Sequence, residues 1–428
     1  MKKRKAIIVY PFYWNSNDVG NKRIERFKFW LLNLGYELVI ISGGRTDKIS
    51  RFDWGVEIEI KDPLGIHKGK GNYSEKSSIK RKPNKLRRLF AYLLFCPDLS
   101  RMWSRNTLKN EIIKNYIKNA DLVISSSPPE SSHITAVSIA REINASLIVD
   151  MRDGWLDEPL KPLLKISALW RWREGLMERK TLNSASRIFV TSNIWKKLLV
   201  ERYPKLENKT IILPNGYPND FLLATNSEIQ KKNKITILHS GSFSLSSVTR
   251  KIGIVLKVIH HSILECNFQG ELKFIGRLEE FEDNEAHVWN HKFEKINWSI
   301  KTIAQIPKLE LYEEIKKVDG LILLSTSLAA VPSKLFEYVP SRKPFLVIAP
   351  RSSAVWEICS SIPQAFLVDI DNLNNSKKMV ADFLEVCRNK NYQCTVPNEF
   401  SFDFLSKIFK SVINEVINES EYKALTIH

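Results

Sequence analysis

The sequence predicts an α/β protein with two doubly wound, Rossmann-like domains and a C-terminal helix. Three observations support this fold class. The chain has 428 residues, a length that suggests two domains with a core each. Short β-rich runs alternate with helical patterns in both halves, as in parallel sheets built from βαβ units. A polar segment that begins with Pro214–Asn219 separates the two series.

The first domain is expected over residues 1–220. Because ligands of open α/β sheets bind outside the carboxyl ends of the strands, we expect chemistry in the loops that follow its strands. The expected strands are Lys5–Tyr10, Glu37–Ser42, Asp121–Ser125, Leu147–Asp150 and Arg187–Thr191. The expected helices are Asn21–Leu34, Thr107–Lys118, Ser132–Ile143 and Trp170–Ala185.

The second domain is expected over residues 221–428, after a linker that continues in polar residues to Asn233. An apolar helical pattern over Phe402–Ile417 predicts the terminal helix, which we assign to this domain. The expected strands are Thr236–His239, Leu272–Ile275, Gly320–Leu324 and Pro344–Ile348. The other expected helices are Arg250–Leu264, Leu309–Lys317 and Ser333–Val339.

Positive charge is concentrated in the first half of the chain. Residues 1–220 hold 40 Lys and Arg against 23 Asp and Glu, a net of +17, whereas residues 221–428 hold 25 against 24, a net of +1. This asymmetry indicates an anionic partner for one domain. The alternative is a lysine-rich composition, which explains many lysines but not their distribution. Nucleic acid is not the expected partner, because no recognition motif accompanies the charge.

Residues 61–100 differ from the rest of that half. Lys61–Arg88 contains ten basic residues and two acids, and the apolar run Leu89–Phe95 follows it. A basic loop beside an apolar segment is typical of contact with an anionic membrane surface. The alternative is a surface loop that leads into a core helix.

The sequence favours a cytoplasmic protein that associates peripherally with the inner face of a membrane. Five scattered cysteines without a C-x-x-C pair disfavour both a disulfide framework and a zinc site. The basic start leads into a short apolar run, Ala6–Tyr10, which we interpret as a buried strand rather than a signal peptide. No apolar stretch approaches the roughly 20 residues that span a bilayer.

Four segments carry a family resemblance over nearly the whole chain. They are Ile124–His133, Val149–Trp155, Ile212–Gly216 and Val331–Tyr338, and together they resemble the glycosyltransferase family 4-like group of GT-B enzymes. Phe95–Trp103 also looks like a segment of members that assemble bacterial polysaccharides. The resemblance implies the GT-B fold, in which two Rossmann-like domains face a central cleft. It also implies retaining transfer of a hexose from a nucleoside-diphosphate sugar to a glycan acceptor, for example a lipid-linked one in lipopolysaccharide or capsule synthesis.

The last of these segments is expected to bind the donor. A turn made by Val331, Pro332 and Ser333 leads into a helix start, where backbone N–H groups bind a diphosphate. Lys334 adds a full positive charge for the same phosphates. The resemblance assigns Glu337 to hydrogen bonds with the ribose diol. The alternative is an amphipathic helix start with a surface Lys and Glu.

A second donor contact is expected after the strand that ends at His239. Gly241 permits close approach of a phosphate, Ser242 lies beside it, and Arg250 can close on the diphosphate with two hydrogen bonds. We interpret His239 itself as a core residue. Gly20 resembles the glycine loop that approaches donor and acceptor in this fold.

One position departs from the family pattern. Many members carry a glutamate eight residues before the ribose-binding one, and this chain has Ala329 there. Contacts to the donor sugar are then expected from backbone amides and hydroxyls of the same loop. The departure keeps open an alternative of another class, a non-catalytic GT-B partner protein that binds a nucleotide sugar.

The acceptor side is expected in the first domain. Asp150, Arg152 and Asp153 follow a strand, and such carboxylates can orient acceptor hydroxyls or accept a proton. The alternative is structural, with Arg152 forming ion pairs that stiffen the loop. His133, at the start of a helix, can face the same cleft or serve only as a helix-start residue.

No metal or other cofactor is expected. The D-x-D sequence Asp369–Asp371 falls between a β-run and Asn-rich residues, where we expect a loop cap. Lys334, Arg250 and a helix dipole can neutralise the leaving diphosphate without a metal.

Overall fold

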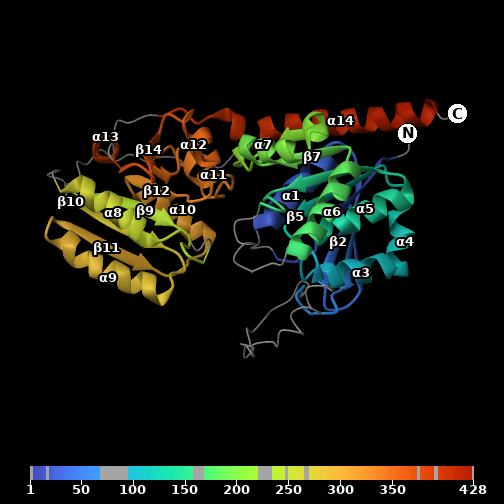
Figure 1. Ribbon diagram of the computed structural model, residues 1–428, viewed down its shortest axis with the longest axis horizontal. Coiled ribbons are helices and arrows are strands. Elements are labelled where there is room, and N and C mark those ends of the chain that lie inside the picture. The colour runs from blue at the N-terminus through green and yellow to red at the C-terminus, as the bar shows by residue number, and fades with distance from the viewer. Residues whose placement is uncertain are drawn as a thin grey trace. The chain divides into compact units, whose positions relative to one another are not determined.

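The computed structural model describes residues 3–15, 19–67, 95–157, 168–219, 234–245, 249–264, 269–373, 376–389 and 394–426. They form two compact units (Figure 1). Unit 1 comprises Met1–Pro214 with Ser406–His428, and unit 2 comprises Asn215–Leu405. Each unit contains one largely parallel sheet with helices packed against it, which confirms the predicted fold class.

Unit 1 is built around an eight-stranded sheet in the order β3-β4-β2-β1-β5-β6-β7-β8. All neighbours pair in parallel except β3 and β4, which are antiparallel. The central strands are buried along almost their whole length, as in parallel sheets covered on both faces. The strands are β1 (Lys5–Val9), β2 (Glu37–Gly44), β3 (Lys48–Phe52), β4 (Gly55–Lys61), β5 (Leu122–Ser127), β6 (Ser146–Met151), β7 (Arg187–Val190) and β8 (Thr210–Ile212).

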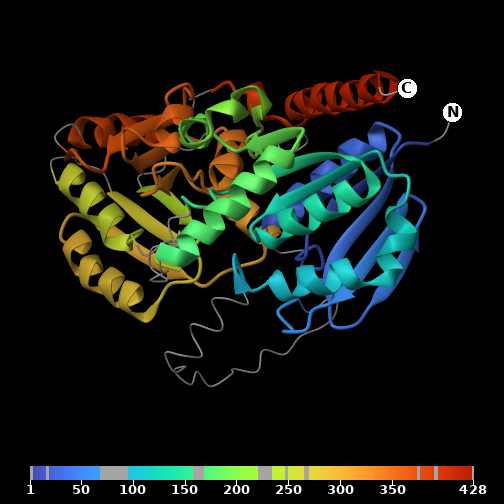
Figure 2. The same ribbon diagram turned by 45° about the vertical axis from the view of Figure 1, so that its right-hand side comes forward.

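The described helices of unit 1 are α1 (Val19–Asn33), α3 (Arg101–Lys109), α4 (Glu111–Ile117), α5 (Ser131–Ile143), α6 (Ala168–Ser184), α7 (Asn193–Arg202) and most of α14 (Phe402–Thr426). Helix α5 packs against β5 and contacts both α3 and α6 (Figure 2). The predicted helix Thr107–Lys118 is divided at Asn110. The side chain of Asn110 accepts a hydrogen bond from the N–H of Ile112 and so starts α4.

Unit 2 is built around a six-stranded parallel sheet in the order β11-β10-β9-β12-β13-β14. Successive residues of β9 point to opposite faces of the sheet. Ile237 belongs to the core on one face and Leu238 to the core on the other, so both faces are covered. The strands are β9 (Lys234–Ser240), β10 (Gln269–Ile275), β11 (Trp298–Ile303), β12 (Gly320–Leu324), β13 (Phe345–Ala349) and β14 (Ala365–Asp369). The helices described are α8 (Ile252–Ile263), α9 (Glu280–Glu294), α10 (Lys308–Lys317), α11 (Leu335–Tyr338), α12 (Ala354–Cys359) and α13 (Ser376–Arg388).

The terminal helix corrects the predicted domain assignment. We expected it in a domain of residues 221–428, but residues 406–428 belong to unit 1. Phe409 of α14 packs against Phe27 of α1 and Phe189 of β7, with ring centroids 5.2 and 5.9 Å apart. Figure 1 shows α14 running beside β7. The apolar stripe of this helix therefore completes the core of unit 1.

Each predicted strand is present, with its ends within three residues of the expected ones. The strands that were not predicted include β3 and β11, which lie at sheet edges and are largely exposed or half-buried. Residues 68–94 of the basic and apolar segment and residues 220–233 of the linker lie outside the described residues. In the part of the chain that the structure describes, no helix combines the length and hydropathy needed to cross a bilayer.

Candidate functional site

Each sheet has one place where the strand order reverses. In unit 1, β1 has β2 on one side and β5 on the other, and in unit 2, β9 has β10 on one side and β12 on the other. Ligands of open α/β sheets bind at such points, outside the carboxyl ends of the strands. Each unit therefore holds one candidate half-site.

In unit 2, the backbone after β9 is open at Gly241. This glycine has a φ of +109°, a conformation that residues with a side chain rarely adopt. A Cβ atom there would lie 3.0 Å from Cε of Lys334. The glycine therefore lets the lysine stem lie against the strand end, and half-buried Ser242 follows it. The structure thus brings together predicted donor residues that are distant in sequence.

Lys334 directly precedes α11, which Tyr338 holds against β9. The Tyr338 hydroxyl accepts a hydrogen bond from the N–H of Ser240 at 2.9 Å and lies 3.0 Å from Ser240 Oγ. Burial raises the pKa of Tyr338 to about 12, so this hydroxyl stays neutral. Helix α11 has only four residues, whereas the sequence predicted Ser333–Val339. Its dipole is correspondingly small, so the positive charge near Gly241 comes mainly from Lys334.

The turn before Lys334 is made by Val331, Pro332 and Ser333, all half-buried. The carbonyl oxygens of Pro332 and Ser333 each accept a hydrogen bond of 3.1 Å, from the N–H groups of Leu335 and Phe336. These bonds fix the path of the backbone into α11. The predicted turn is therefore present, with a shorter helix after it.

Glu337 lies between two lysines. Its Oε2 is 3.6 Å from Nζ of Lys334, and its Oε1 is 3.4 Å from Nζ of Lys308. The side chain is 17% exposed, so one edge of the carboxylate remains accessible. Its three-residue spacing from Lys334 puts both groups on one side of α11, as predicted. A carboxylate in this place can accept hydrogen bonds from neighbouring hydroxyls of a ligand.

Arg250 and Lys334 place two positive charges near the buried ring of His239. Burial is the main cause that lowers the pKa of His239 to about 3, and these two charges lower it further. The neutral ring stacks on Phe243 at 4.3 Å, and its Nδ1 lies 3.0 Å from the carbonyl oxygen of Ile322. Burial also lowers the pKa of Arg250, whose Nε has no hydrogen-bond partner among the described residues. That N–H is therefore unpaired within the part of unit 2 that the structure describes.

The end of β12 supplies hydroxyl groups to the same half-site. Ser325 is buried directly after β12, and its Oγ has no partner among the residues described. Thr326 Oγ1 lies 2.8 Å from Oγ1 of Thr249, which ties the segment before Arg250 to this strand end. Ala329 is buried in the loop that follows. Two hydroxyl side chains therefore lie at the end of β12, directly before the loop that contains Ala329.

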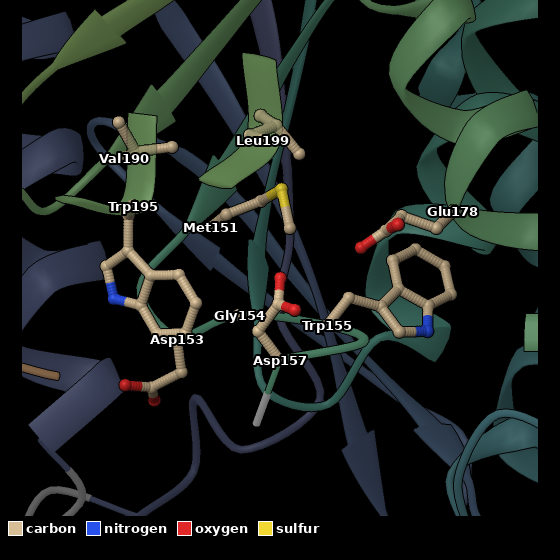
Figure 3. A pocket seen from close by; sticks show the side chains of 9 residues that line it. All are labelled: Met151, Asp153, Gly154, Trp155, Asp157, Glu178, Val190, Trp195 and Leu199. Atoms are coloured by element: carbon tan, nitrogen blue, oxygen red, sulfur yellow. The ribbon is translucent and has the colours of Figure 1, made fainter. Parts of the chain in front are cut away.

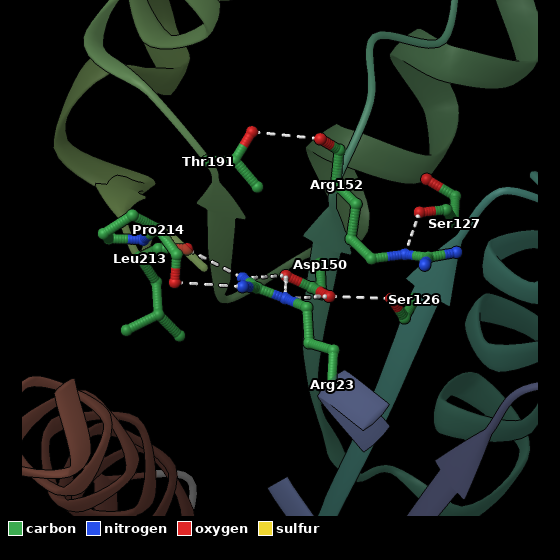
Figure 4. A network of polar contacts seen from close by, with 8 residues as sticks. All are labelled: Arg23, Ser126, Ser127, Asp150, Arg152, Thr191, Leu213 and Pro214. Atoms are coloured by element: carbon green, nitrogen blue, oxygen red, sulfur yellow. Dashed lines mark hydrogen bonds and ion pairs between the residues drawn. The ribbon is translucent and has the colours of Figure 1, made fainter. Parts of the chain in front are cut away.

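In unit 1, Asp150 is buried and paired with Arg23. The carboxylate accepts three hydrogen bonds of 2.7 to 3.0 Å from the guanidinium and one of 2.7 Å from the Ser126 hydroxyl (Figure 4). Arg23 also donates to the carbonyl oxygens of Leu213 and Pro214, at 2.8 and 3.2 Å. The structure corrects the catalytic prediction for Asp150, because its oxygens are fully used inside unit 1. The pair joins α1 to β5, β6 and the segment after β8.

Arg152 lies across the carboxyl edge of the same sheet. Its Nε donates to the carbonyl oxygen of Ser127 at 2.8 Å (Figure 4). Its Nη2 donates to the carbonyl oxygen of Pro128, also at 2.8 Å. The guanidinium carbon lies 5.4 Å from the ring centroid of Tyr10. A Cβ atom on Gly20 would overlap both this guanidinium and the Tyr10 hydroxyl. The structure thus places Gly20 in unit 1, where it lets α1 approach Arg152.

Asp153 lines a small cavity at this edge. The cavity has room for about one water molecule, which is too little for a sugar. Burial raises the pKa of half-buried Asp153, so it is a better proton acceptor near neutral pH than an ordinary carboxylate. Figure 3 shows the lining residues, which are Met151, Asp153, Gly154, Trp155, Asp157, Glu178, Val190, Trp195 and Leu199.

His133 is completely buried at the start of α5. Its Nδ1 lies 2.8 Å from Oγ of Ser125, and its ring centroid lies 6.1 Å from that of Trp155. Burial lowers the pKa of His133 to about 3, so the imidazole is neutral. This corrects its predicted place facing a cleft, because no edge of the ring is accessible. His133 is therefore part of the buried layer that packs against the end of β5 and the loop after β6.

Three residues of the two half-sites were missed from the sequence: Arg23, Lys308 and Tyr338. Arg23 stands four residues before buried Phe27, so both lie on the inner face of α1. An arginine on an apolar helix face therefore indicates, from the sequence alone, that a carboxylate is buried beside it. Lys308 gave no such signal, because it reaches Glu337 only through the tertiary fold.

Among the described residues, no group of three or more His, Cys, Asp or Glu is arranged to hold a metal ion. The N–H of Asp371 donates to Oδ1 of Asp369 at 3.0 Å. This is the local bond of a loop cap, as expected for the D-x-D sequence.

No family model matches the chain, and no curated protein matches it. Several solved structures do match the chain. A glycosyltransferase from Rickettsia africae is 17% identical, with a TM-score of 0.58 over 97% of this chain and 99% of that one. Anabaena HepE in complex with UDP and glucose is 12% identical, with a TM-score of 0.59 over 96% and 100%. The trehalose 6-phosphate synthase of Burkholderia multivorans is 10% identical, with a TM-score of 0.63 over 100% and 98%. At these identities the likeness concerns the fold, and the chain has the GT-B fold.

Proposed function

We propose that this chain is a glycosyltransferase that moves a sugar from a nucleoside-diphosphate sugar to a hydroxyl group of a glycan acceptor. The observation that carries the proposal is the group of side chains at the carboxyl ends of β9 and β12. Lys334 and Arg250 supply positive charge near His239, Glu337 lies beside Lys334, and the lysine stem lies against the open backbone of Gly241. Two cations next to a carboxylate match a diphosphate joined to a ribose diol. The GT-B fold is consistent with this chemistry.

On the donor side, Lys334 and Arg250 stabilise the negative charge that develops on the leaving diphosphate. Fixed positive groups of this kind lower the barrier because they need no rearrangement during the reaction. The guanidinium of Arg250 donates to a phosphate oxygen, and Glu337 accepts hydrogen bonds from the ribose hydroxyls. Since the cations are side chains, we propose a metal-independent reaction.

On the acceptor side, the bond from the anomeric carbon to the diphosphate breaks as the bond to the acceptor oxygen forms. The acceptor hydroxyl then loses a proton, and Asp153 is the carboxyl of this edge whose raised pKa suits proton acceptance. Arg152 holds the edge in place through the two carbonyl groups after β5. Retention of the anomeric configuration is proposed from the resemblance of the motifs.

We further propose that the acceptor is a lipid-linked or otherwise anionic saccharide used in cell-surface polysaccharide synthesis. The enzyme would then work in the cytoplasm, attached peripherally to the inner face of the membrane. Support for this comes from the net charge of +17 on residues 1–220, which favours an anionic partner.

The test is a hydrolysis and binding screen of UDP-sugars and GDP-sugars, starting with UDP-glucose. We expect slow hydrolysis of one donor class and calorimetric binding of its free nucleotide. Lys334→Ala is expected to abolish most of the binding, whereas Lys317→Ala, in an exposed pair with Glu314, leaves it unchanged. Failure of every nucleotide to bind the folded protein would refute the proposal.

A second candidate function is favoured by Ala329, which replaces the family glutamate near the donor sugar. A non-catalytic partner protein would bind the same nucleotide sugar without turning it over. Binding without hydrolysis, and without transfer to any added glycan acceptor, would favour this second function.

A further inference from the structure

Helix α6 is amphipathic in the opposite sense from an ordinary surface helix. Its acids, Glu174 and Glu178, face inward and are 1% and 0% exposed. Three large apolar side chains face outward, with Leu169 62%, Trp172 63% and Leu176 48% exposed. A surface helix usually buries its apolar side chains and exposes its charges. Folding of unit 1 therefore does not account for the outer face of α6.

The inward acid Glu178 is held by partners within unit 1. Glu178 accepts hydrogen bonds from Arg202 at 3.2 Å and from the Tyr203 hydroxyl at 2.9 Å. The N–H of Leu156, in the loop after β6, also donates to Glu178 at 3.4 Å. These contacts fix the rotation of α6 about its axis. Trp172 is thus exposed because the buried contacts of Glu178 set the orientation of α6.

The exposed apolar residues form one stripe. Leu169, Trp172 and Leu176 are spaced by three and four residues, which places them on the same side of a helix. Arg173, Arg179 and Lys180 fall on the same side by the same spacing. Because both acids of α6 point inward, every charge on this side is positive. We call these six residues the α6 face.

Neighbouring α3 extends the same character. Leu99, just before α3, is 56% exposed. Burial and the positive charges of Arg105 and Arg173 lower the pKa of Arg101, so basic residues of α3 and α6 lie close together. Helix α5 contacts both helices and lies between them in the chain (Figure 2). Apolar and basic groups therefore continue beyond a single helix.

We propose that the α6 face docks on an anionic lipid bilayer. Trp and Leu enter the interface between headgroups and acyl chains, while Arg and Lys pair with lipid phosphates. A second copy of this chain is a poor occupant, because it would bring two positively charged faces together. This docking surface rests on the proposed function in one respect only, namely that the acceptor saccharide is linked to a membrane lipid.

The position of α6 links this surface to the acceptor half-site. Glu178 lines the same small cavity as Asp153, and Gly175 lies against Leu156 of the loop after β6. Trp172 precedes Gly175 by one turn of helix. Docking through the α6 face would therefore hold the carboxyl edge of this sheet near the bilayer, where a lipid-linked sugar is presented.

The test is sedimentation of the full chain with vesicles of phosphatidylglycerol and phosphatidylcholine, and with phosphatidylcholine alone. We expect binding to the anionic vesicles that decreases as salt is raised. Arg179→Gln with Lys180→Gln should weaken it about thirty-fold, since each basic residue near such a surface contributes about a factor of five. The matched control, Lys197→Gln with Lys205→Gln, removes the same charge from exposed positions of unit 1 and should change it little.

A second pair of variants tests the apolar stripe. Trp172→Ser with Leu176→Ser should weaken vesicle binding about tenfold or more. Val288→Ser with Leu309→Ser, which changes exposed apolar residues of unit 2, should leave it unchanged. Circular dichroism checks that all variants are folded.

Equal vesicle binding by α6 and control variants would overturn the proposal, as would equal binding to neutral vesicles. A dimer without lipid that Trp172→Ser disrupts would overturn it in favour of a second copy. Calorimetric nucleotide binding, measured on the same samples, separates the two claims. If the wild-type chain binds nucleotide but no anionic vesicles, the docking surface alone is refuted. If it binds anionic vesicles but no nucleotide, the proposed donor site alone is refuted.

Discussion

Replacing Asp150 by Asn tests whether this residue holds unit 1 together or takes part in the reaction. The substitution keeps the size of the side chain, so it creates no cavity, but it removes the charge that pairs with Arg23. Both side chains are at most 1% exposed, and the guanidinium cannot turn to water. An uncompensated buried charge costs about 3–5 kcal/mol. That is a large part of the roughly 5–15 kcal/mol that stabilises a typical domain.

Urea unfolding should therefore show a midpoint lowered by about 1–2 M, taking a slope of 2–3 kcal/mol per molar for a unit of this size. Hydrogen exchange in peptides of α1 and β6 assigns the loss to unit 1. Glu421→Gln is the matched control, because its pair with Arg4 is 45% and 60% exposed at the two side chains. Such a pair contributes about 1 kcal/mol or less.

The double variant Arg23→Met with Asp150→Leu should recover part of the lost stability, because it removes both buried charges together. The reasoning would be refuted by an Asp150→Asn protein that is as stable as the wild type. If that protein also lost transfer activity while binding nucleotide normally, Asp150 would return to the catalytic role first predicted for it.

Three other predictions follow from the two half-sites. Lys334→Ala and Glu337→Ala should each weaken nucleotide binding by about 1.5–3 kcal/mol in calorimetry, as for hydrogen bonds to charged groups, with Lys317→Ala as the unaffected control. Gly20→Ala should displace the arginine at the edge of unit 1, so the rate of transfer should fall while nucleotide affinity stays the same; equal rates would show that α1 can shift to accommodate a methyl group. Burial lowers the pKa of His239 to about 3, below its unfolded value near 6.5, so protonation favours the unfolded chain. Stability of unit 2 should fall as pH drops from about 6.5 toward 3, and His239→Asn should make this fall less steep in urea titrations at each pH.

The sequence was sufficient to predict the fold where strands are continuous and apolar. Ile7 and Ile40 belong to such strands, and their runs stand out from any helical pattern. The edge strand β3 was missed because its sequence, KISRF, has exposed charged residues and no apolar alternation. The place of α14 could not be read either, since Phe409 fits any apolar core and only the tertiary fold selects unit 1.

The candidate donor residues were predictable because they lie in short local motifs. Lys334 and Glu337 are three residues apart, so their shared side follows from helix geometry alone. The role of Asp150 was predicted wrongly because the local sequence around a carboxylate at a strand end is the same whether the side chain faces solvent or a buried cation. The decisive partner, Arg23, is 127 residues away, and nothing local specifies that contact.

The return of α14 to unit 1 affects the order in which the two units can fold during translation. Unit 2 is a continuous stretch, Asn215–Leu405, and all of it leaves the ribosome before most of α14 does. At roughly 5–20 residues per second, synthesis of that stretch takes on the order of 10–40 s. Throughout that interval Phe27 and Phe189 lack the ring of Phe409 that covers them in the finished protein. Unit 1 is thus synthesised first but completed last. During that interval we expect nascent unit 1 to bind a chaperone that shields exposed aromatic surface.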